Sequence, residues 1–342
     1  MILILTEAYD PAADDLIQRF QARGIRTIRY ETADFPQKVR HIFRKGAGVS
    51  RNLLEINGQT INLAEVQTVW NRRPKKPTVS KMITGDDREF AQKETEEIYR
   101  GILHTLQNRF WVNPYTLNEV AEYKPYQLQV AQHIGWEIPQ TLITNNPDEV
   151  REFYRQYDGN IIYKTVSSPF RLGSGVGTPP QLIYTNRVKA SDLERLESVT
   201  LAPCLFQEYV PKKVELRVTV VGRKTFAAEI HSQQSERSRE DWRRYDFDNT
   251  PYLVHQLPAE VEAKCQQLVK EMGLVFGCID LILTPDDRYV FLEINPNGQW
   301  GWIESLTGMP IGDNLVQMMI EGTPNYTDPP MMAKSAVVGA EV

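Results

Sequence analysis

The stretch GCIDLILTPDDRYVFLEINPN, residues Gly277 to Asn297, decides the fold. Two apolar runs, Val275 to Leu283 and Tyr289 to Ile294, flank Thr284-Pro285-Asp286-Asp287, in which the proline is pre-set for the second corner of a type I turn. The pattern predicts a β-hairpin. Its strands carry polar side chains at positions where a core strand would have none, namely Asp280, Glu293 and Asn295.

The three polar side chains of the hairpin are predicted to converge. Side chains alternate between faces along a strand, so Glu293 and Asn295 share one side. A turn that pairs Leu283 with Arg288 sets the register. Asp280 then lies on that same side, diagonal to Glu293 at roughly 7–8 Å. A slip of one residue in this register would place the two carboxylates on opposite faces.

Two carboxylates and an amide oxygen are ligands that suit Mg²⁺, which normally shares its shell with water and substrate phosphates. The hairpin therefore indicates a magnesium nucleotide site, with a nucleoside triphosphate as the implied guest. The alternative is a half-exposed antiparallel pair whose acidic side chains face solvent. The hairpin alone does not decide between these two interpretations.

Composition limits the classes of function. The chain has 342 residues, enough for two or three domains, and its 41% hydrophobic and 24% charged residues are ordinary for a globular protein. A net charge of −5 and the lack of a long basic run argue against a nucleic-acid partner. The apolar start, MILILTEAYD, has no basic segment before it, so neither secretion nor membrane insertion is expected. Three cysteines without paired spacing indicate buried thiols in a reducing cytoplasm: Cys204, Cys265 and Cys278.

Residues 1–115 are predicted to form an α/β domain. A strand at Ile2 to Leu5, a helix from Ala12 to Arg23 and a second strand make a βαβ opening that lacks the glycine fingerprint of a dinucleotide site. A hairpin with the turn Asn57-Gly58 follows, and then a strand, a long helix and a short strand. Arg72 and Arg73, at the end of a strand, are predicted either to hold an anionic group or to form a solvated charge pair.

Residues 116–206 contain groups suited to phosphate. Lys124 lies at the start of a predicted helix, whose dipole favours anions. Lys164 lies inside the apolar strand NIIYKTV, where an ammonium needs an anionic partner, either phosphate or a neighbouring carboxylate. The loop SSPFRLGSGVGT, residues 167–178, offers backbone N–H groups to a nucleotide as a lid, although a solvent loop would look the same. Its glycines are Gly173, Gly175 and Gly177.

The next segment is predicted to hold adenine. Gln207-Glu208-Tyr209-Val210 continues an apolar strand as a connector, whose backbone offers a donor and an acceptor. The strand Val214 to Val221 then alternates, with Glu215 and Arg217 on its polar face. That face is either plain surface or a site in which Arg217 supports phosphate transfer, with Glu215 placing it or contacting substrate.

Residues 236–252 are dense in charged and aromatic side chains, for which a surface loop is the default interpretation. The alternative is a segment in which Trp242 and Arg243 contact the aromatic and carboxylate groups of a peptide. Beyond the hairpin, a glycine and tryptophan loop from Asn297 to Trp302 lies beside the proposed metal site. The tail from about Thr323 is expected to be loosely held.

The order of these features resembles the ATP-grasp superfamily over about residues 115 to 325. The resemblance implies a mixed α/β and α+β fold, with ATP between two subdomains at 116–206 and 207–325. An N-terminal α/β pre-ATP-grasp domain at 1–115 precedes them, and a flexible tail at 326–342 follows. In that superfamily a substrate carboxylate attacks the γ-phosphate of ATP, and a nucleophile opens the resulting acylphosphate with release of phosphate.

The resemblance also assigns roles to residues. Two Mg²⁺ ions are expected at Asp280, Glu293 and Asn295. Arg217 and Glu215 are the expected catalytic residues, although Glu215 stands where many relatives have aspartate. The expected ATP-binding residues are Lys124, Lys164, Gly173, Gly175, Gln207, Glu208, Tyr209, Val210 and Glu215.

Within the superfamily, the chain resembles the microviridin-type, or graspetide, peptide ligases. The stretches that carry this likeness are Trp70 to Pro74, Ile230 to Gln233, Asp241 to Arg243 and Asn295 to Trp300. Those enzymes join Asp or Glu side chains of ribosomally made precursor peptides to Ser or Thr hydroxyls as esters, or to Lys amines as amides. The resemblance implies a precursor peptide with a leader helix as partner, and a homodimer. It implies peptide contacts at Arg72, Arg73, His231, Trp242, Arg243 and Asn297.

Two other functions stay open from the sequence. An ATP-grasp ligase could add a free amino acid to a protein or small molecule, which product mass would reveal. A non-catalytic ATP-binding regulator would show no substrate-dependent release of ADP. The choice between ester and amide is open as well, because the chemistry before the nucleophile arrives is shared.

Overall fold

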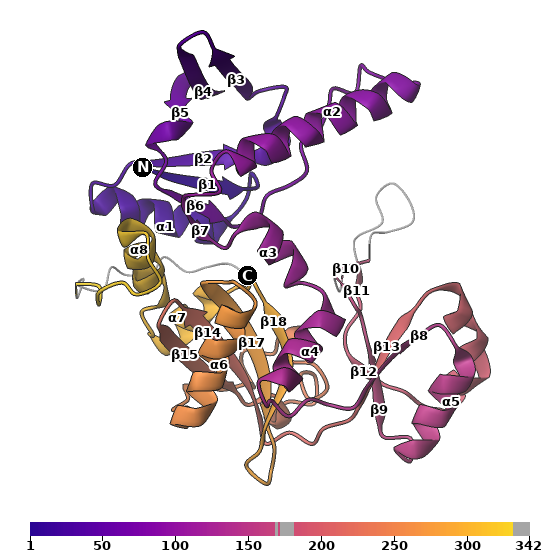
Figure 1. The fold of residues 1–342 in the computed structure, drawn as a ribbon. Helices are drawn as coiled ribbons and strands as arrows, with labels where there is room; N and C mark the ends of the chain where they lie inside the picture. The colour runs from indigo at the N-terminus through magenta and orange to yellow at the C-terminus, as the bar shows by residue number, and fades with distance from the viewer. Residues whose placement is uncertain (168–169, 172–180, 331–342) are drawn as a thin grey trace.

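The structure, a computed structural model, describes residues 1–167, 170–171 and 181–330 (Figure 1). The expected phosphate-binding glycines Gly173 and Gly175 lie outside the described residues, and so does the end of the tail, 331–342.

The N-terminal domain is built on a parallel sheet in the order β2-β1-β6-β7, with a separate antiparallel sheet of β3, β4 and β5. Every residue of β1 is buried, because α1 and α8 cover one face of the sheet while α2 packs on the other. The Asn57-Gly58 turn between β4 and β5 has positive φ at both residues, as the hairpin prediction requires. The elements are β1 (Ile2–Thr6), α1 (Pro11–Ala22), β2 (Thr27–Glu31), β3 (Arg40–Gly46), β4 (Val49–Ile56), β5 (Gln59–Asn62), β6 (Thr68–Asn71), α2 (Gly85–His104) and β7 (Phe110–Val112).

The central part of the chain forms an antiparallel sheet in the order β12-β9-β13-β8, with a small core under α5. Two helices, α3 and α4, lead into it from the N-terminal domain (Figure 1). The elements are α3 (Tyr115–Val120), α4 (Lys124–His133), β8 (Thr141–Thr144), α5 (Pro147–Gln156), β9 (Ile161–Lys164), β10 (Phe170–Arg171), β11 (Gln181–Leu182), β12 (Asn186–Arg187) and β13 (Cys204–Glu208).

The C-terminal part forms an antiparallel sheet in the order β16-β15-β14-β17-β18, which contains the predicted hairpin as β17 and β18. The apolar face of β14 packs against α4 and α6, as the alternation of its side chains predicts. The opposite face carries Glu215 and Arg217 and is also buried, so it is not plain surface. The elements are β14 (Val214–Val221), β15 (Lys224–Ile230), β16 (Tyr252–Val254), α6 (Ala259–Glu271), β17 (Phe276–Leu283), β18 (Tyr289–Asn295), α7 (Gly301–Thr307) and α8 (Ile311–Glu321).

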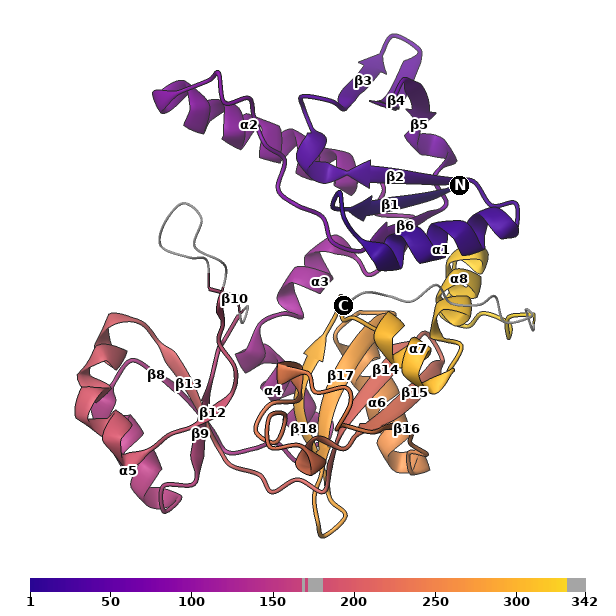
Figure 2. The same ribbon diagram turned by 180° about the vertical axis from the view of Figure 1, so that it is seen from behind.

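One hydrophobic core joins the N-terminal domain to the C-terminal sheet. Side chains of β1 and α1 pack with Trp300 and with side chains of α8, far along the sequence. Arg19 of α1 also forms a two-pronged pair with Glu304 of α7, at 2.8 and 3.2 Å. Seen from behind in Figure 2, α1 lies against α8, whereas the central sheet stands apart from both. The β17–β18 hairpin therefore rests on a body to which residues 1–112 contribute.

The expectation of a loose tail from Thr323 is wrong for its first residues. Tyr326 is buried, and its hydroxyl donates to the Asn314 side chain at 3.0 Å and the Val221 carbonyl at 3.1 Å. Arg223 in turn pairs with Asp328 at 2.7 Å. Through Tyr326, the chain that follows α8 is therefore held against both α8 and the end of β14.

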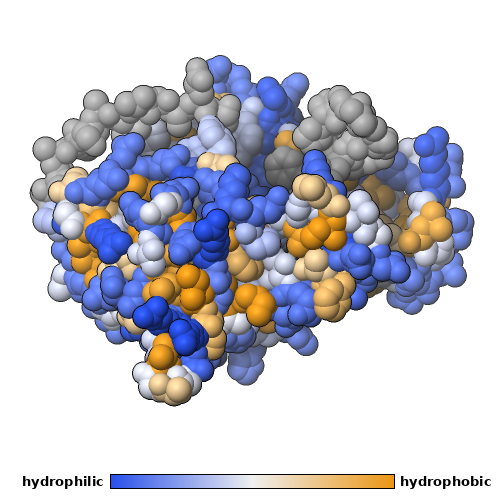
Figure 3. Space-filling model, turned by 90° about the horizontal axis from the view of Figure 1, so that it is seen from above, coloured by the Kyte–Doolittle hydropathy of each residue, from blue (hydrophilic) through white to orange (hydrophobic). Residues whose placement is uncertain are grey.

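The cysteine prediction holds for Cys265 and Cys278, which are buried free thiols, whereas Cys204 is only partly buried. Among the described residues, no helix is long and apolar enough to cross a membrane. The face of the molecule in Figure 3 is mainly hydrophilic, with apolar side chains scattered among charged ones.

Candidate active site

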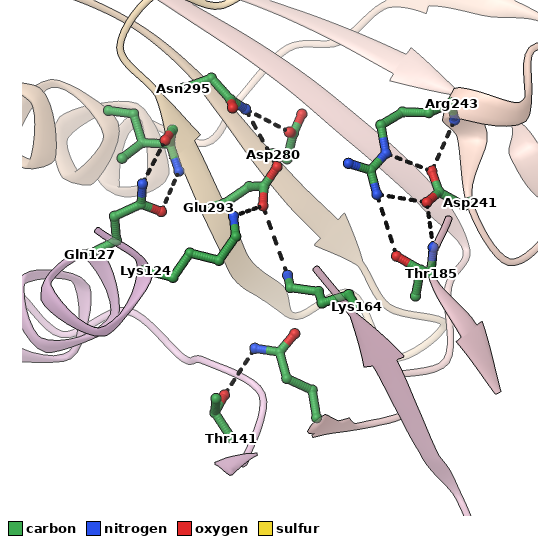
Figure 4. A network of polar contacts seen from close by, with 12 residues as sticks. Lys124, Gln127, Thr141, Lys164, Thr185, Asp241, Arg243, Asp280, Glu293 and Asn295 are labelled. Atoms are coloured by element: carbon green, nitrogen blue, oxygen red, sulfur yellow. Dashed lines mark hydrogen bonds and ion pairs between the residues drawn. The ribbon is translucent and has the colours of Figure 1, made fainter. Parts of the chain in front are cut away.

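A cavity that is partly open to solvent lies between the central sheet and the C-terminal sheet. Eight of its lining positions are residues that the sequence assigns to ATP or metal: Lys164, Gln207, Glu208, Tyr209, Val210, Glu215, Asp280 and Glu293. Figure 4 shows the charged side chains turned toward one another across this space. Lys124, Arg217 and Asn295 join the group from behind through ion pairs and hydrogen bonds.

The register of the hairpin differs from the prediction. Leu283 pairs with Tyr289, one residue beyond the predicted Arg288, and continued regularly this register would set Asp280 opposite Leu292. A β-bulge between Leu281 and Asp280 shifts the pairing by one residue, so Asp280 lies directly opposite Glu293. The bulge therefore brings both carboxylates to one face, a convergence that the slipped register would have destroyed.

Asp280 is held by an arginine on the neighbouring strand. Arg217 of β14 lies directly opposite Asp280 of β17, and its Nη1 donates to both carboxylate oxygens at 2.9 and 3.0 Å. Its Nη2 donates to the carbonyl of Gln299 at 3.1 Å. Burial and the neighbouring Glu293 raise the pKa of Asp280 against the pull of Arg217. The arginine is thus held by Asp280, an expected metal ligand that lines the cavity.

Glu293 is the acidic partner of both expected phosphate lysines. Its Oε2 lies 2.5 Å from Nζ of Lys124 and 3.9 Å from Nζ of Lys164. Burial opposes the ionisation of Glu293, but the positive charges of Lys124, Lys164 and Arg243 outweigh it and hold its pKa well below the ordinary value. Burial lowers the pKa of Lys164 to about 8. Of the two predicted partners of Lys164, the structure shows the carboxylate, Glu293.

The donor set fits a magnesium ion that shares its shell with phosphate. Nδ2 of Asn295 lies 3.2 Å from Asp280 Oδ2 and 3.5 Å from Glu293 Oε1, so the three side chains converge as predicted. In the described part of the chain, no group of three or more His, Cys, Asp or Glu side chains could hold a metal alone. A site of two carboxylates and one amide leaves coordination positions for water and phosphate. Mg²⁺ typically keeps such ligands when it is bound to a protein.

The predicted adenine segment borders the same cavity. Gln207 to Val210 lie along one wall, beside the apolar side chains of Ile162, Ile282 and Leu292. The Gln207 side chain is buried and donates to Thr141 at 2.9 Å, while its Oε1 has no partner among the described residues. A buried acceptor without a donor is costly unless a ligand supplies one. The wall therefore suits a flat, apolar group with an N–H donor.

Glu215 does not place Arg217, which was one of its two expected roles. Its carboxylate instead accepts from Lys212 Nζ at 3.0 Å and from Ser232 Oγ at 2.5 Å. Burial raises the pKa of Glu215 despite Lys212. Glu215 lines the cavity. Its position is therefore consistent with its other expected role, contact with substrate.

The residues expected to contact peptide fall into two groups. Arg72 is 1% exposed and lies between the domains, where it donates to the carbonyls of Asn297 and Gly298 at 3.0 and 3.3 Å. Its Nε also lies 3.4 Å from the Asp10 carboxylate. This burial favours a structural role for Arg72 over direct peptide contact. Arg73 is partly exposed and lies 3.6 Å from Glu7.

The second group lies at the mouth of the cavity or near it. Trp242 and Arg243 line the cavity, and Trp242 stacks on Trp302 with ring centroids 5.1 Å apart. Arg243 is clamped by Asp241, with its Nε and Nη2 donating at 2.8 and 2.6 Å. His231 directly follows the last residue of β15 and pairs with Glu229 at 2.8 Å. The structure brings Trp242 and Arg243 to the acidic pair but not His231.

Three residues at the site were missed by sequence reasoning: Gln127, Lys212 and Asp241. The amide of Gln127 on α4 pairs with both backbone groups of Ile294, receiving at 3.2 Å and donating at 2.8 Å, which anchors β18 between Glu293 and Asn295 (Figure 4). A glutamine among the apolar positions of a helix was the available signal. Asp241 had a signal too, since aspartate is a frequent N-cap residue and here caps a short 3₁₀ turn.

Comparisons with known proteins agree with this geometry. The model of the MvdD pre-ATP grasp domain matches residues 1–119, and the model of the RimK-like ATP-grasp domain matches residues 121–319. A search of curated proteins gave no match. Matches among solved structures are extensive, however.

The macrocyclase MdnC of Microcystis aeruginosa MRC, solved with its precursor peptide MdnA, is 32% identical over 94% of this chain and 100% of that chain, with a TM-score of 0.83. A RiPP-associated ATP-grasp ligase of Chryseobacterium gregarium, solved with ADP, a leader and a core peptide, is 27% identical over 96% and 99%, with a TM-score of 0.84. The macrocyclase MdnB of Microcystis aeruginosa MRC is 32% identical over 93% and 98%, with a TM-score of 0.77. The predicted fold is confirmed by these matches, and the chain belongs to the ATP-grasp family, as a member with an MvdD-type pre-ATP-grasp domain that resembles the macrocyclases of ribosomal peptides.

Proposed function

We propose that this chain is an ADP-forming ligase that activates Asp or Glu side chains of a ribosomal precursor peptide and joins them to Ser or Thr hydroxyls as esters, or to Lys amines as amides. The observation that carries the proposal is the paired arrangement of Lys124 and Lys164 on Glu293, and Arg217 on Asp280, across one cleft. Similarity to ligases solved with ADP or with precursor peptides supports the same conclusion.

The chemistry follows from what each wall of the cavity offers. A peptide carboxylate oxygen forms a bond to the γ-phosphorus of ATP as the bond from that phosphorus to the bridging oxygen breaks, and ADP leaves with the electron pair. A hydroxyl or amine of the same peptide then attacks the acyl carbon, loses its proton and expels phosphate. Lys124, Lys164 and Arg217 stabilise the anionic oxygens of the transfer. Gln207 to Val210 hold the adenine.

We infer that Mg²⁺ is required and that Asp280, Glu293 and Asn295 would hold it, as two ions. When bound, the metal neutralises phosphate charge, a contribution that side chains alone do not match at this site. The fit rests on the convergence of the three side chains on the cleft side of the hairpin. Gly173 and Gly175 are proposed to add backbone N–H groups to the same phosphates.

The peptide is proposed to enter near the 236–252 segment. Trp242 and Arg243 offer an aromatic surface and a cation beside the acidic pair, and the partly exposed rings of Tyr245 and Phe247 continue the apolar surface. Arg73 and His231 are proposed as outer contacts for the leader or core. The units are proposed to be 1–115, 116–206 and 207–325, and we place the enzyme in the cytoplasm, where ATP is available and its free thiols stay reduced.

We also infer a homodimer formed by the N-terminal domain. The β3–β4 ribbon is exposed and basic, with Arg40, Arg44, Lys45 and Arg51 around the 58%-exposed Phe43. The projecting helix α2 is exposed and acidic around the 68%-exposed Phe90 (Figure 1). Two copies could bury both apolar side chains with complementary charge. Arg44→Glu with Lys45→Glu is expected to give a monomer in light scattering, while an unchanged mass would refute this surface.

The test of the proposed function is incubation of the purified protein with ATP, Mg²⁺ and short peptides that carry a leader and a core rich in Thr, Ser, Lys, Asp and Glu. The expected result is peptide-dependent release of ADP, with loss of one water from the peptide for each bond formed. A gain in mass from a free amino acid would instead support an amino-acid ligase. Nucleotide binding without ADP release, for every peptide tried, would support a regulator.

A further inference from the structure

The segment from Glu240 to Arg244, hereafter the bridging segment, connects the two sheets that wall the cavity. It belongs to the insertion between β15 and β16, yet its side chains contact residues 184–187 of the central sheet. Asp241, Trp242 and Arg243 line the cavity together with Thr185. The bridging segment is therefore both a wall of the proposed nucleotide site and a non-covalent connection between its halves.

Asp241 is the centre of this connection. Its side chain is almost fully buried, and Oδ2 accepts from the backbone N–H of Thr185 at 2.8 Å, across the cleft. The same carboxylate accepts from the backbone N–H of Arg243 at 3.0 Å and from its guanidinium Nε and Nη2 at 2.8 and 2.6 Å. One carboxylate thus fixes an arginine of the C-terminal half to a strand end of the central half (Figure 4).

The contacts around Asp241 extend the connection in both directions. Arg244 donates to the Asn186 side chain at 2.7 Å, and Glu240 lies 3.6 Å from Arg187. Arg243 also reaches the hydroxyl of Thr185 at 3.4 Å. On the hinge side, Lys212 donates to the Glu240 carbonyl at 3.0 Å. Each of these contacts joins the bridging segment either to the central half or to the hinge. A change in the relative position of the central and C-terminal halves would therefore form or break them.

The clamp leaves part of Arg243 for the cavity. Within the described residues, its Nη1 has no hydrogen-bond acceptor, while Nε and Nη2 are held by Asp241 and Thr185. Figure 4 shows this free nitrogen turned toward the side of the cleft where Asp280 and Glu293 lie. An arginine that is held at two nitrogens and free at the third is preorganised for an anion, because little side-chain freedom remains to be lost on binding.

We propose that Asp241 is a positioning residue that couples closure of the two halves of the cleft to the placement of Arg243 beside the reacting anion. When the central sheet docks, the Thr185 N–H completes the acceptor set of Asp241, and the guanidinium is locked in its forward orientation. When the sheet moves away, Asp241 and Arg243 lose their Thr185 partners, and only the contacts between Asp241 and Arg243 still hold the guanidinium. The proposal rests on the proposed function, because the anion is the γ-phosphate or the peptide carboxylate of that reaction.

The proposal differs from a purely structural role for Asp241 in one measurable respect. A structural residue would lower stability and affect every kinetic parameter, whereas a residue that acts through Arg243 should lose its effect when Arg243 is already impaired. A double-mutant cycle on kcat isolates this dependence. A comparison of KM for ATP with KM for peptide tells which of the two anions Arg243 serves.

The experiment uses the full chain and an active precursor peptide, with Asp241→Asn, Arg243→Lys and the double variant. Asp241→Asn is expected to lower kcat for peptide-dependent ADP release by about tenfold to a hundredfold, because a misplaced charge-stabilising group costs that much. The double variant should be no slower than the slower single variant. The matched control is Asp286→Asn, since Asp286 pairs with Arg288 two residues further on, as Asp241 does with Arg243, but lies in the exposed turn between β17 and β18. It should retain the wild-type kcat.

Additive losses in the cycle, or an unchanged kcat for Asp241→Asn, would overturn the proposal. If Asp241→Asn does not fold, Asn186→Ala provides a second route, because it removes the neighbouring Arg244 contact from the same connection. A several-fold fall in kcat with unchanged affinity for ATP would support the coupling, and no fall would overturn it. Failure of the proposed function would be separate, because the wild-type protein would then release no ADP with any peptide.

Discussion

Asp280 and Glu293 face each other directly across the β17–β18 hairpin, because a bulge between Asp280 and Leu281 corrects the register just before the site. Each carboxylate has its own cationic partner, Arg217 for Asp280 and Lys124 for Glu293. Two acidic groups in one buried pocket would otherwise repel each other. The arrangement keeps both available for a metal and phosphate without an unpaired charge.

Asp280→Asn should lower kcat by about a hundredfold or more, since it removes a proposed metal ligand and leaves the Arg217 guanidinium without its charged partner. ADP release in the presence of peptide is the measurement. Asp286→Asn, in the exposed turn of the same hairpin, is the control and should be close to wild type. Equal activity of the two variants would refute a metal role for Asp280.

Gly298→Ala should damage the site through crowding. A Cβ at Gly298 would lie 2.4 Å from Cβ of Cys278 and 2.8 Å from Nη2 of Arg217, so the loop or the arginine must move. We expect a fall in kcat of about tenfold or more. Gly301→Ala is the matched control, because nothing lies within 4 Å of its added Cβ, and it should be neutral or stabilising by about 0.5–1 kcal/mol. If both variants have the same kcat, Arg217 is not sensitive to this loop.

Gln127→Leu should loosen β18 between the proposed metal ligands Glu293 and Asn295. The change leaves the buried N–H and C=O of Ile294 without partners, at a cost of about 1–3 kcal/mol for each group. Urea unfolding measures the loss of stability, and kcat measures the displacement of Glu293 and Asn295. The exposed Gln129 on the same helix is the control, and Gln129→Leu should change the free energy of unfolding by less than about 0.5 kcal/mol. Similar losses for the two variants would argue against the anchor.

Arg72→Ala and Arg73→Ala separate a buried role from a surface one. Arg72 is buried beside Asp10, so its removal should cost about 3–5 kcal/mol of the free energy of unfolding. Arg73 makes a partly exposed pair with Glu7, and its removal should cost less than about 1 kcal/mol. Chemical denaturation decides the first point, and KM for peptide decides whether either arginine contacts substrate. A stable Arg72→Ala protein with a raised peptide KM would restore the peptide-contact interpretation.

Much of the fold was predictable because its signals are local. Two patterns depend on neighbouring residues alone: the alternation in Val214 to Val221 and the apolar runs on either side of the turn at Pro285. The structure has β14 at the first, and β17 and β18 at the second. The anionic partner of Lys164 was predicted only as a class, a phosphate or a carboxylate, and the structure supplies Glu293. Strand alternation was enough to place Glu293 and Asn295 on one side, whereas Asp280 joins them through the bulge between Asp280 and Leu281.

The parts that could not be predicted depend on contacts between segments far apart in the chain. The bulge at Asp280 has no glycine to mark it and follows from how β17 fits between β14 and β18. The sequence shows Arg72 only as a charged residue at the end of a strand. Its burial follows from its hydrogen bonds to residues 297–299. The sequence places Tyr326 in the tail, and its burial depends on contacts with α8 and with the end of β14.

The most direct test of the central claim compares the wild-type protein with Glu293→Gln in one assay of ADP release and peptide mass. The wild type is expected to release ADP only with a precursor peptide, and the peptide is expected to lose one water per bond formed. Glu293→Gln is expected to release no ADP and to leave the peptide mass unchanged. Glu137→Gln, an exposed surface change, is expected to behave as the wild type does. Near-normal ligation by Glu293→Gln would contradict the claim that this carboxylate, facing Asp280 across the hairpin, holds the magnesium nucleotide.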